Sequence, residues 1–359
     1  MSVVYKKLED VCEILDSRRV PITAKDRKAG TYPYYGANGL QDYVADYIFD
    51  DELVLLAEDG GNFGSKERPI AYRVSGKCWV NNHAHVLKAK PNMHVDYLCY
   101  ALMFYDTEGL VNGATRQKLT QAAMRQMVIP YRDMTEQLQI IKKISQIVRS
   151  IEKRKEELQL LDQLVKSRFI ELFGDMESNP KGWRESTLGT ECYYIKDGPH
   201  KSPPYIDDQN GIPFISTRNV VNGDGIDWST AKYISEADYL QCIKKCKPEK
   251  GDILYSKGGT TGIAKYVDTD KRFANWVHVA VLKFGDQLDG RFLERMLNMD
   301  YCYRQSQQLT KGIANRDFVL SAIAQVKIFV PPIELQRQYV RFVEQTDKSK
   351  LCSKMEVAA

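Results

Sequence analysis

The sequence predicts a mixed α/β (α+β) protein made of two tandem copies of one unit, each followed by a long helix. Three observations carry this prediction. Similar segments recur in the same order through the chain, Asn-Gly, Gly-Gly and Asp-Gly turns separate valine- and isoleucine-rich runs, and residues 134–172 contain neither glycine nor proline. Such turns between β-branched runs are typical of strands, and an uninterrupted periodic run is typical of a helix.

Four pairs of matching segments define an internal two-fold repeat. YKKLEDVCEI (5–14) corresponds to RESTLGTECYYI (184–195), LVLLAEDGGNFG (53–64) to GDILYSKGGTTG (251–262), HAHVLK (83–88) to HVAVLK (278–283), and GATRQKLTQAAMRQMVIP (113–130) to GIANRDFVLSAIAQVKIFVPP (312–332). The offset is 180 at Leu8/Leu188, 198 at Gly60/Gly258, 195 at His83/His278 and 199 at Gly113/Gly312. Four matches in one order indicate a duplication.

The segment 134–172 predicts a long helix with a coiled-coil seam, about 58 Å long if every residue is helical. Its seam positions recur every seven residues at Ile144, Ile151, Leu158, Val165 and Leu172. The pattern restarts after Pro331-Pro332, and we expect the second helix to pair antiparallel with the first, so that the helices separate two α/β domains. The expected boundaries are 1–133 for the first domain, 134–175 for the spacer helix, 176–332 for the second domain and 333–359 for a C-terminal helix.

Composition excludes several classes of protein. No apolar run approaches the roughly 18 residues of a membrane span, and the N-terminus lacks a signal-peptide core. The eight cysteines include no CxxC pair, which predicts reduced thiols in a cytoplasmic protein. A net charge of +4 permits a nucleic-acid partner without requiring one.

The residues around the end of the spacer helix resemble a known family. LVKSRFIELFGD (164–175), NPKGW (179–183) and TLG (187–189) resemble the central conserved region of type I restriction–modification specificity subunits. The segment IKDGPHKSPPYIDDQNGIPFISTRNV (195–220) is similar to that family's second target-recognition domain, and YPYYGANGLQDYV (32–44) and VEQTDKSK (343–350) fit the same pattern. The resemblance covers essentially the whole chain. Because the family usually continues well past Lys350, the C-terminal conserved helix is expected to be truncated.

The resemblance implies a DNA-specificity subunit that catalyses nothing itself. Two target-recognition domains would each read one half of a bipartite site on double-stranded DNA, and the paired helices would set the gap between the halves. The helices would also recruit modification subunits, which carry S-adenosylmethionine and methylate adenine. Restriction (motor–nuclease) subunits using ATP and magnesium would join them. No cofactor, catalytic residue or membrane partner is expected in this chain.

Candidate DNA contacts are polar residues in loops between apolar strands, because Arg and Lys pair with guanine or phosphate and Asn and Gln with adenine. In the first domain they are Tyr35, Asn38, Lys66, Arg68, Asn81, Asn82, Arg116, Gln117 and Lys118. In the second they are His200, Lys201, Ser216, Thr217, Arg218, Asn219, Lys257, Thr260, Thr261, Asn315 and Arg316. Arg116 and Arg316 are the strongest of these, because they occupy nearly equivalent places in the repeat.

Two alternatives remain open. Ser202-Pro203-Pro204-Tyr205 matches the loop with which amino-methyltransferases grip a flipped base, so the chain could be a self-contained adenine-N6 methyltransferase. No glycine-rich strand–turn–helix for its cofactor stands at a workable spacing. The coiled coil could instead belong to a scaffold protein that does not bind DNA. No metal site is predicted, since Cys78, His83 and His85 fit no standard spacing.

Overall fold

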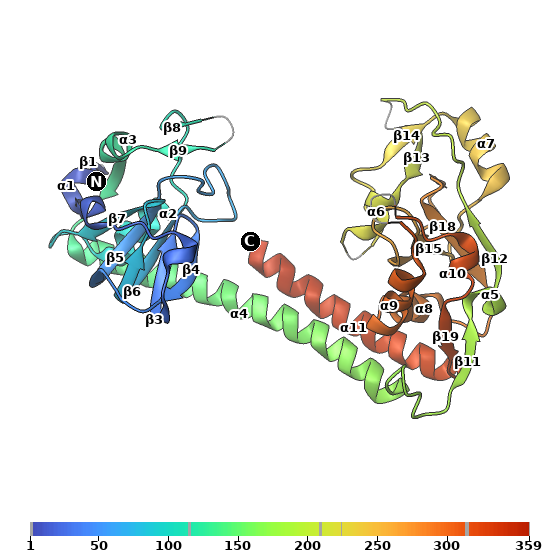
Figure 1. Cartoon of the computed structure of the whole chain (residues 1–359). Coiled ribbons are helices and arrows are strands. Elements are labelled where there is room, and N and C mark those ends of the chain that lie inside the picture. Colours follow the sequence, from blue (N-terminus) through green and yellow to red (C-terminus); the bar gives the residue numbers. More distant parts are fainter. Residues whose placement is uncertain (1–2, 114–115, 208–209, 224, 313–315, 359) are drawn as a thin grey trace. The chain divides into compact units, whose positions relative to one another are not determined.

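The computed structural model describes the backbone of residues 3–113, 116–207, 210–223, 225–312 and 316–358, and side chains as far as Ser353. The chain forms two compact units, Met1–Lys153 and Arg154–Ala359 (Figure 1). No helix within the described ranges is long and apolar enough to cross a membrane.

The first unit is built on a six-stranded sheet with the order β2-β7-β5-β6-β3-β4. Its strands are β2 (Cys12–Ile14), β3 (Ala29–Gly36), β4 (Gly39–Val44), β5 (Phe49–Ala57), β6 (Ala71–Val80) and β7 (Ala84–Ala89). Residues 53–57 of β5 are buried at every position, as expected of a strand covered on both faces. On one face Val54 and Leu56 pack in a cluster with Leu98 and Leu102, and on the other Leu53 joins a second cluster.

Short elements complete the first unit. They are β1 (Val4–Lys7), α1 (Leu8–Val11), the 3-10 turns η1 (Asp16–Arg18) and η2 (Ala24–Asp26), α2 (Val95–Met103), β8 (Val111–Asn112), β9 (Lys118–Leu119), α3 (Gln121–Gln126) and β10 (Val128–Tyr131). Strands β1 and β10 pair antiparallel, with Val4 opposite Tyr131, so the beginning and the end of the domain are tied together.

The second unit repeats this order in two smaller sheets, β12-β18-β15-β16 and β14-β13-β17. Its strands are β11 (Arg184–Thr187), β12 (Cys192–Asp197), β13 (Ile212–Ile215), β14 (Lys232–Ile234), β15 (Ile253–Ser256), β16 (Ala264–Tyr266), β17 (Ala274–Asn275), β18 (Val279–Phe284) and β19 (Lys327–Val330). Its shorter helices are α5 (Leu188–Glu191), α6 (Thr217–Val221), α7 (Glu236–Lys245), α8 (Gly290–Leu297), α9 (Asp300–Leu309) and α10 (Leu320–Ile323). The strand pair β11–β19 corresponds to β1–β10.

The sheet divides in the second unit because the equivalent of β6 is interrupted. In the first unit one strand pairs with β5 at Arg73 and with β3 at Trp79, six residues later. In the second unit the corresponding positions are Tyr266 and Ala274, which are eight residues apart and belong to β16 and β17. In the second unit these two pairings thus fall on two separate strands, with two more residues between them than in the first unit. The mixed α/β fold and the internal repeat are confirmed.

Helix α4 spans Met134–Phe173, and both of its ends follow from the sequence. At its start the Asp133 carboxylate accepts a hydrogen bond of 2.9 Å from the Glu136 backbone N–H, as an N-cap does. At its end Gly174 has φ +81, a left-handed conformation that glycine adopts readily. The Trp183 indole then donates a 2.8 Å hydrogen bond to the free Phe173 carbonyl, which gives the tryptophan of NPKGW a structural role.

In the second unit α4 lies antiparallel against α11 (Ile333–Ala358) (Figure 1). Asp162 pairs with Lys350 at 2.6 Å, whereas Phe169, farther along α4, contacts the ring of Tyr339, nearer the start of α11. Val165, Phe169 and Tyr339 are buried in the main core of this unit. The predicted antiparallel pairing of the two long helices is confirmed.

Each long helix is fixed to its domain by one buried glutamine. The Gln137 amide oxygen accepts a 2.8 Å bond from the His94 backbone N–H, at the start of α2. The Gln336 amide oxygen does the same for Asp289, at the start of α8, at 2.9 Å. Both side-chain amides also donate to two backbone carbonyls, and both residues are fully buried. The sequence marks these positions only as the openings of two helices, so the role of the glutamines follows from the structure.

Candidate nucleic-acid interface

Most of the candidate DNA contacts of the first domain lie at the surface. The exposed ones are Asn38, Lys66, Arg68, Asn82, Arg116, Gln117 and Lys118. Tyr35 is half-buried and packs against the ring of Tyr72. Asn81 is buried: its amide nitrogen donates to Gln41 and its amide oxygen accepts from the His83 backbone N–H. The hydrogen bonds of Asn81 are therefore made within the protein.

The candidates of the second domain are more evenly divided between surface and interior. His200, Lys201, Arg218 and Thr260 are exposed, Ser216, Thr217 and Arg316 are half-buried, and Asn219, Lys257 and Thr261 are buried. Asn219 caps α6 together with Ser216 and donates to the Asp227 carbonyl, so it holds a turn in place. Arg316 donates to the side chains of Gln307 and Thr261. Asn315 lies outside the described residues.

Equivalent backbone hydrogen bonds surround the glycine turns of the two domains. The Gly60 N–H donates to the Gln117 carbonyl, and the Gly259 N–H donates to the Arg316 carbonyl. Both glycines have positive φ, +70 and +71, which favours glycine. The offset here is 199, so Gly60 corresponds to Gly259.

This register corrects two details of the sequence alignment by one residue. Gly60 does not correspond to Gly258, and Arg316 corresponds to Gln117, not Arg116. Gly258 corresponds to Asp59, since Asp59 bridges to Lys118 as Gly258 bridges to Asp317. No residue with a side chain fits at position 258 without a shift of its neighbours, because a Cβ atom there would lie 1.9 Å from the Nδ1 atom of His278.

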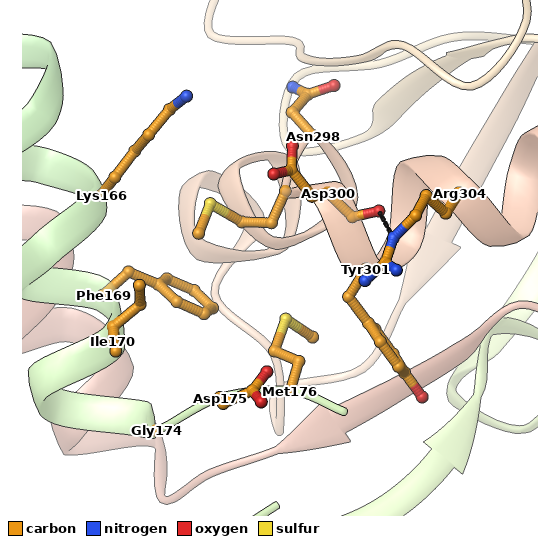
Figure 2. Close-up of a pocket in the computed structure, with 11 residues that line it drawn as sticks. Lys166, Phe169, Ile170, Gly174, Asp175, Met176, Asn298, Asp300, Tyr301 and Arg304 are labelled. Carbon is orange, nitrogen blue, oxygen red and sulfur yellow. Dashed lines mark hydrogen bonds between the residues drawn. The ribbon is translucent and has the colours of Figure 1, made fainter. Parts of the chain in front are cut away.

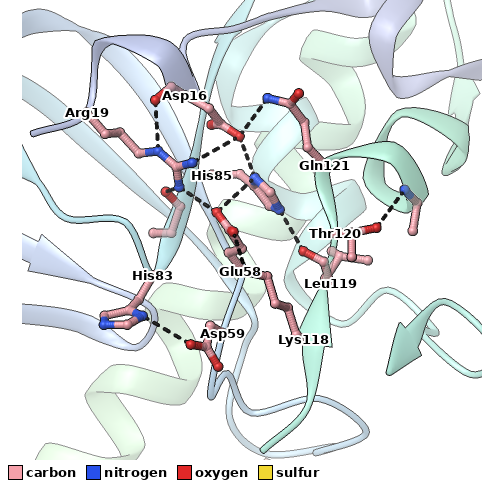
Figure 3. Close-up of polar contacts among 12 residues, drawn as sticks. Asp16, Arg19, Glu58, Asp59, His83, His85, Lys118, Leu119, Thr120 and Gln121 are labelled. Atoms are coloured by element: carbon pink, nitrogen blue, oxygen red, sulfur yellow. Dashed lines mark hydrogen bonds and ion pairs between the residues drawn. The ribbon is translucent and has the colours of Figure 1, made fainter. Parts of the chain in front are cut away.

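Charged side chains form a continuous chain of contacts beside the first glycine turn (Figure 3). Arg19 lies 3.5 Å from Asp16 and 2.6 Å from Glu58, and Glu58 lies 3.2 Å from Lys118. Both ring nitrogens of the buried His85 face an oxygen atom. Nδ1 lies 2.6 Å from the Asp16 carboxylate, and Nε2 lies 2.9 Å from the Leu119 carbonyl. Burial alone raises the pKa of Asp16, but its hydrogen bond and charge interaction with His85 lower the pKa overall.

Asp16, Glu58 and His85 bring their ligand atoms within 4.8 Å of one another, which is a distance suitable for a metal ion. The Arg19 guanidinium already supplies a cation to both carboxylates. We therefore interpret this cluster as an ion-pair network. His83 lies outside this cluster and pairs with Asp59 at 3.3 Å (Figure 3). Arg116 pairs with the same carboxylate at 2.6 Å.

A second chain of charges occupies the same place in the second domain. Asp197, the last residue of β12, corresponds to Asp16, which lies two residues past the end of β2. Its carboxylate lies 3.4 Å from the ammonium of Lys257. Lys257 in turn lies 3.2 Å from Asp317. Lys245 also pairs with Asp197, at 2.7 Å. The Lys257 predicted as a DNA contact is thus buried between two carboxylates.

The Ser202–Tyr205 segment lies largely exposed in the second domain. The Tyr205 ring stacks under the ammonium of Lys232 at 4.2 Å and contacts Phe214. Tyr205 and Lys232 also line a surface groove with Trp228 and Tyr233. These contacts are typical of an aromatic side chain that anchors a proline-rich loop.

The seam residues of α4 differ in burial. Val165 is buried, and Leu172 packs against the core of the second unit, whereas Ile144, Ile151 and Leu158 are half-buried. Leu160, Leu164 and Ile170 are exposed. Near the end of the helix a pocket of about 250 Å³ opens between α4 and α9, with Phe169, Ile170 and Met176 on one side and Tyr301 on the other (Figure 2).

Sequence comparison finds relatives of one kind. The chain is 37% identical over 140 residues to a type I restriction enzyme specificity subunit of Haemophilus influenzae, in a match that spans 39% of this chain and 36% of that protein. It is 21% identical over 377 aligned positions to the type I restriction enzyme MjaIX specificity subunit of Methanocaldococcus jannaschii, spanning 94% of this chain and 85% of that one.

Solved structures share the fold over the full length of this chain. The type I restriction-modification system S subunit from M. genitalium matches with a TM-score of 0.60 at 16% identity, covering 92% of that chain. A chain from a structural study of the assembly and conformational transition of the type I R-M system matches with a TM-score of 0.57 at 18% identity, covering 94% of that chain.

The family match accounts for both halves of the repeat. The type I restriction modification DNA specificity domain family matches residues 2–161 and 180–355, so each unit carries one such domain. This match supports the specificity interpretation over the methyltransferase and scaffold alternatives. The chain belongs to the family of type I restriction–modification DNA specificity subunits, which are the non-catalytic part of those complexes.

Proposed function

We propose that this chain reads a two-part site on double-stranded DNA, with residues 1–133 reading one half and residues 176–332 the other. One observation carries the proposal: equivalent backbone hydrogen bonds hold a polar segment beside a glycine turn in each domain. That segment contains Arg116 and Gln117 in the first domain and Arg316 in the second. The two domains share a framework and differ in these side chains, so the two half-sites differ.

The exposed candidates divide by the chemistry of their side chains. Lys66, Arg68, Lys201 and Arg218 are suited to phosphate oxygens or guanine, and Asn38, Asn82 and Gln117 to adenine. Tyr35, Asn81, Asn219 and Thr261 support the loops from within, since they are partly or fully buried. The main DNA contact therefore falls to the exposed group.

We further propose that α4 and α11 recruit the modification subunits. Leu160, Leu164 and Ile170 leave apolar surface exposed on α4, which is typical of an association surface. Ile170 also lines the pocket between α4 and α9, whose lining includes two basic residues, Lys166 and Arg304, and two acidic ones, Asp175 and Asp300 (Figure 2). An apolar side chain flanked by charged groups on the partner would fit this pocket. S-adenosylmethionine belongs to those partners, and ATP and magnesium belong to the restriction subunits that complete the cytoplasmic complex.

Genome-wide mapping of methylated adenine tests the proposal. The chain would be expressed with its modification subunits in a host that lacks other adenine methylation. We expect one two-part motif with an unspecified gap, and we expect the motif to vanish when this chain is omitted. Methylation that persists without this chain, or a single continuous motif, would contradict the proposal.

A further inference from the structure

The two series of ion pairs described above, one beside each glycine turn, occupy the same position in the two domains. Their outermost residues, Lys118 and Asp317, have opposite charge. Glu58 and Lys257 are equivalent, because the N–H of each donates to the carbonyl of the corresponding histidine, His83 or His278, at 2.9 Å. The carbonyl of each then accepts from Leu119 or Phe318. Lys118 and Asp317 are therefore equivalent as well. The inner residue is acidic and the outer one basic in the first domain, and the reverse holds in the second.

The inner ends of the two series explain this exchange of sign. Both begin at an aspartate at the end of the first sheet strand: Asp16 lies just past β2, and Asp197 is the last residue of β12. In the second domain Lys257 faces its aspartate directly, which leaves the outer position to an acid. In the first domain Arg19 stands between Asp16 and Glu58, which leaves the outer position to a base (Figure 3). Negative and positive side chains alternate in both series. The first domain has one more residue, Arg19, so its outermost residue is basic where that of the second domain is acidic.

The environment of each pair is also alike. The inner side chains are mostly buried, with 13% of Glu58 and 7% of Lys257 exposed, whereas the outer ones are half exposed, 50% for Lys118 and 49% for Asp317. Breaking a partly buried pair costs more than breaking a pair at the surface. Glu58 would keep Arg19 and Lys257 would keep Asp197 after such a change, so the loss is that of one of two partners. The outer residue is therefore held to the domain by its inner partner.

We propose that Lys118 and Asp317 are positioning residues that hold the DNA-reading segments of the two domains in place. Each directly follows a candidate reader, Gln117 or Arg316, whose carbonyl is bonded to a glycine turn. The proposal rests on the proposed function, because it concerns how the same two segments read DNA. According to this proposal, the charge of the buried inner partner determines whether the outer residue is basic or acidic, and contact with DNA does not.

A direct phosphate contact is the rival explanation, and it predicts a different result. If the outer charges acted on phosphate, Lys118→Asp would weaken DNA binding and Asp317→Lys would strengthen it. If they position the segments, both changes place like charges together and both impair recognition. Asp317→Lys therefore separates the two explanations by the direction of its effect.

The experiment uses the complete complex of this chain with its modification subunits and a duplex carrying the mapped site. We expect Lys118→Asp and Asp317→Lys each to lower methyl transfer by about tenfold, as a loss of roughly 1.4 kcal/mol would. Each should relax base preference in one half-site only, and the two should affect different halves. Lys118→Arg and Asp317→Glu, which keep the sign, should stay within about twofold of the wild type.

Matched controls remove the effect of net charge. Lys25→Asp and Asp286→Lys make the same change of charge at exposed positions of the two domains and should leave base preference unchanged. If a reversal prevents folding, Lys118→Met and Asp317→Asn remove the charge without repulsion and should give smaller losses in the same half-sites. Tighter binding by Asp317→Lys, or equal losses in both half-sites from either variant, would overturn the inference. A wild-type complex that methylates no two-part site would instead overturn the proposed function.

Discussion

At the scale of single residues, the buried glutamines at the starts of α4 and α11 carry the connection between helix and domain. Gln336 satisfies one backbone N–H, that of Asp289, and two backbone carbonyls, those of Gln287 and Pro331. Removing a partner from a buried backbone group costs about 1–3 kcal/mol. The same three contacts recur at Gln137, so the cost applies to both domains.

We therefore predict that Gln336→Ala lowers the free energy of unfolding by about 2–4 kcal/mol, because several buried groups lose their partner at once. Urea unfolding followed by circular dichroism measures the change. Gln338→Ala removes the same side chain from the exposed side of α11 and should change the free energy by less than about 0.5 kcal/mol. Equal effects of the two substitutions would show that Gln336 is not an anchor.

Thiol reactivity gives a second prediction at this scale. Seven of the eight cysteines are buried, and Cys352 on α11 is exposed. Burial raises the pKa of the Cys12 thiol to about 12 and that of Cys192 to about 12, so these thiols stay protonated and unreactive near pH 8. We expect Ellman's reagent to titrate one thiol rapidly in the folded chain and all eight in urea. Cys352→Ser should abolish the rapid phase; several rapid thiols would contradict the described burial.

At the scale of elements, we propose that the length of α4 bears on DNA reading. It runs for 40 residues, about 60 Å at 1.5 Å per residue. Its final turns are buried against α11 and the core of the second unit, and the preceding seam residues are half-buried. If α4 sets the gap between the half-sites, a change in its length should change the gap in the recognised site.

We predict that four residues inserted after Lys155 lengthen α4 by about 6 Å and nearly restore its helical face. The methylated motif should keep both half-sites and gain one or two base pairs between them, at about 3.4 Å each. Inserting two residues instead turns the following helix by about 200° and should abolish methylation. Mapping methylated adenine reads out both variants, and an unchanged gap after the four-residue insertion would refute the role as a spacer.

At the scale of the whole molecule, each domain closes on itself through the strand pair that joins its start to its end, β1–β10 or β11–β19. A domain closed in this way can be exchanged as one piece. The hydrogen bonds that hold each polar segment also lie within one domain. Both features favour independent reading of the two half-sites.

We predict that replacing residues 1–130 with the matching domain of a relative changes one half-site and leaves the other unchanged. The reciprocal exchange of residues 176–332 serves as the control and should change only the other half. Both motifs are read by mapping methylated adenine. A change in both halves after either exchange would show that the repeat is structural and that the domains do not read separately.

Sequence by itself determined the features that depend on local chemistry. The absence of glycine and proline predicted α4, whose observed bounds of Met134–Phe173 lie within one residue of the run 134–172. Repeated glycine turns and β-branched runs predicted two similar α/β domains, and the residues from Leu164 to Trp183 identified the family. These signals suffice because helix continuity and turn geometry are set by residues adjacent in the chain.

Tertiary structure alone decided which residues face one another. The one-residue correction that aligns Gln117 of the first domain with Arg316 of the second comes from hydrogen bonds, within each domain, between segments far apart in sequence. Burial of Asn81 and Asn219 likewise depends on neighbours from other strands and turns. The exchanged ion pairs became visible only through this pairing, because Glu58 and Lys118, or Lys257 and Asp317, are about 60 residues apart in the chain and meet only when the sheet forms.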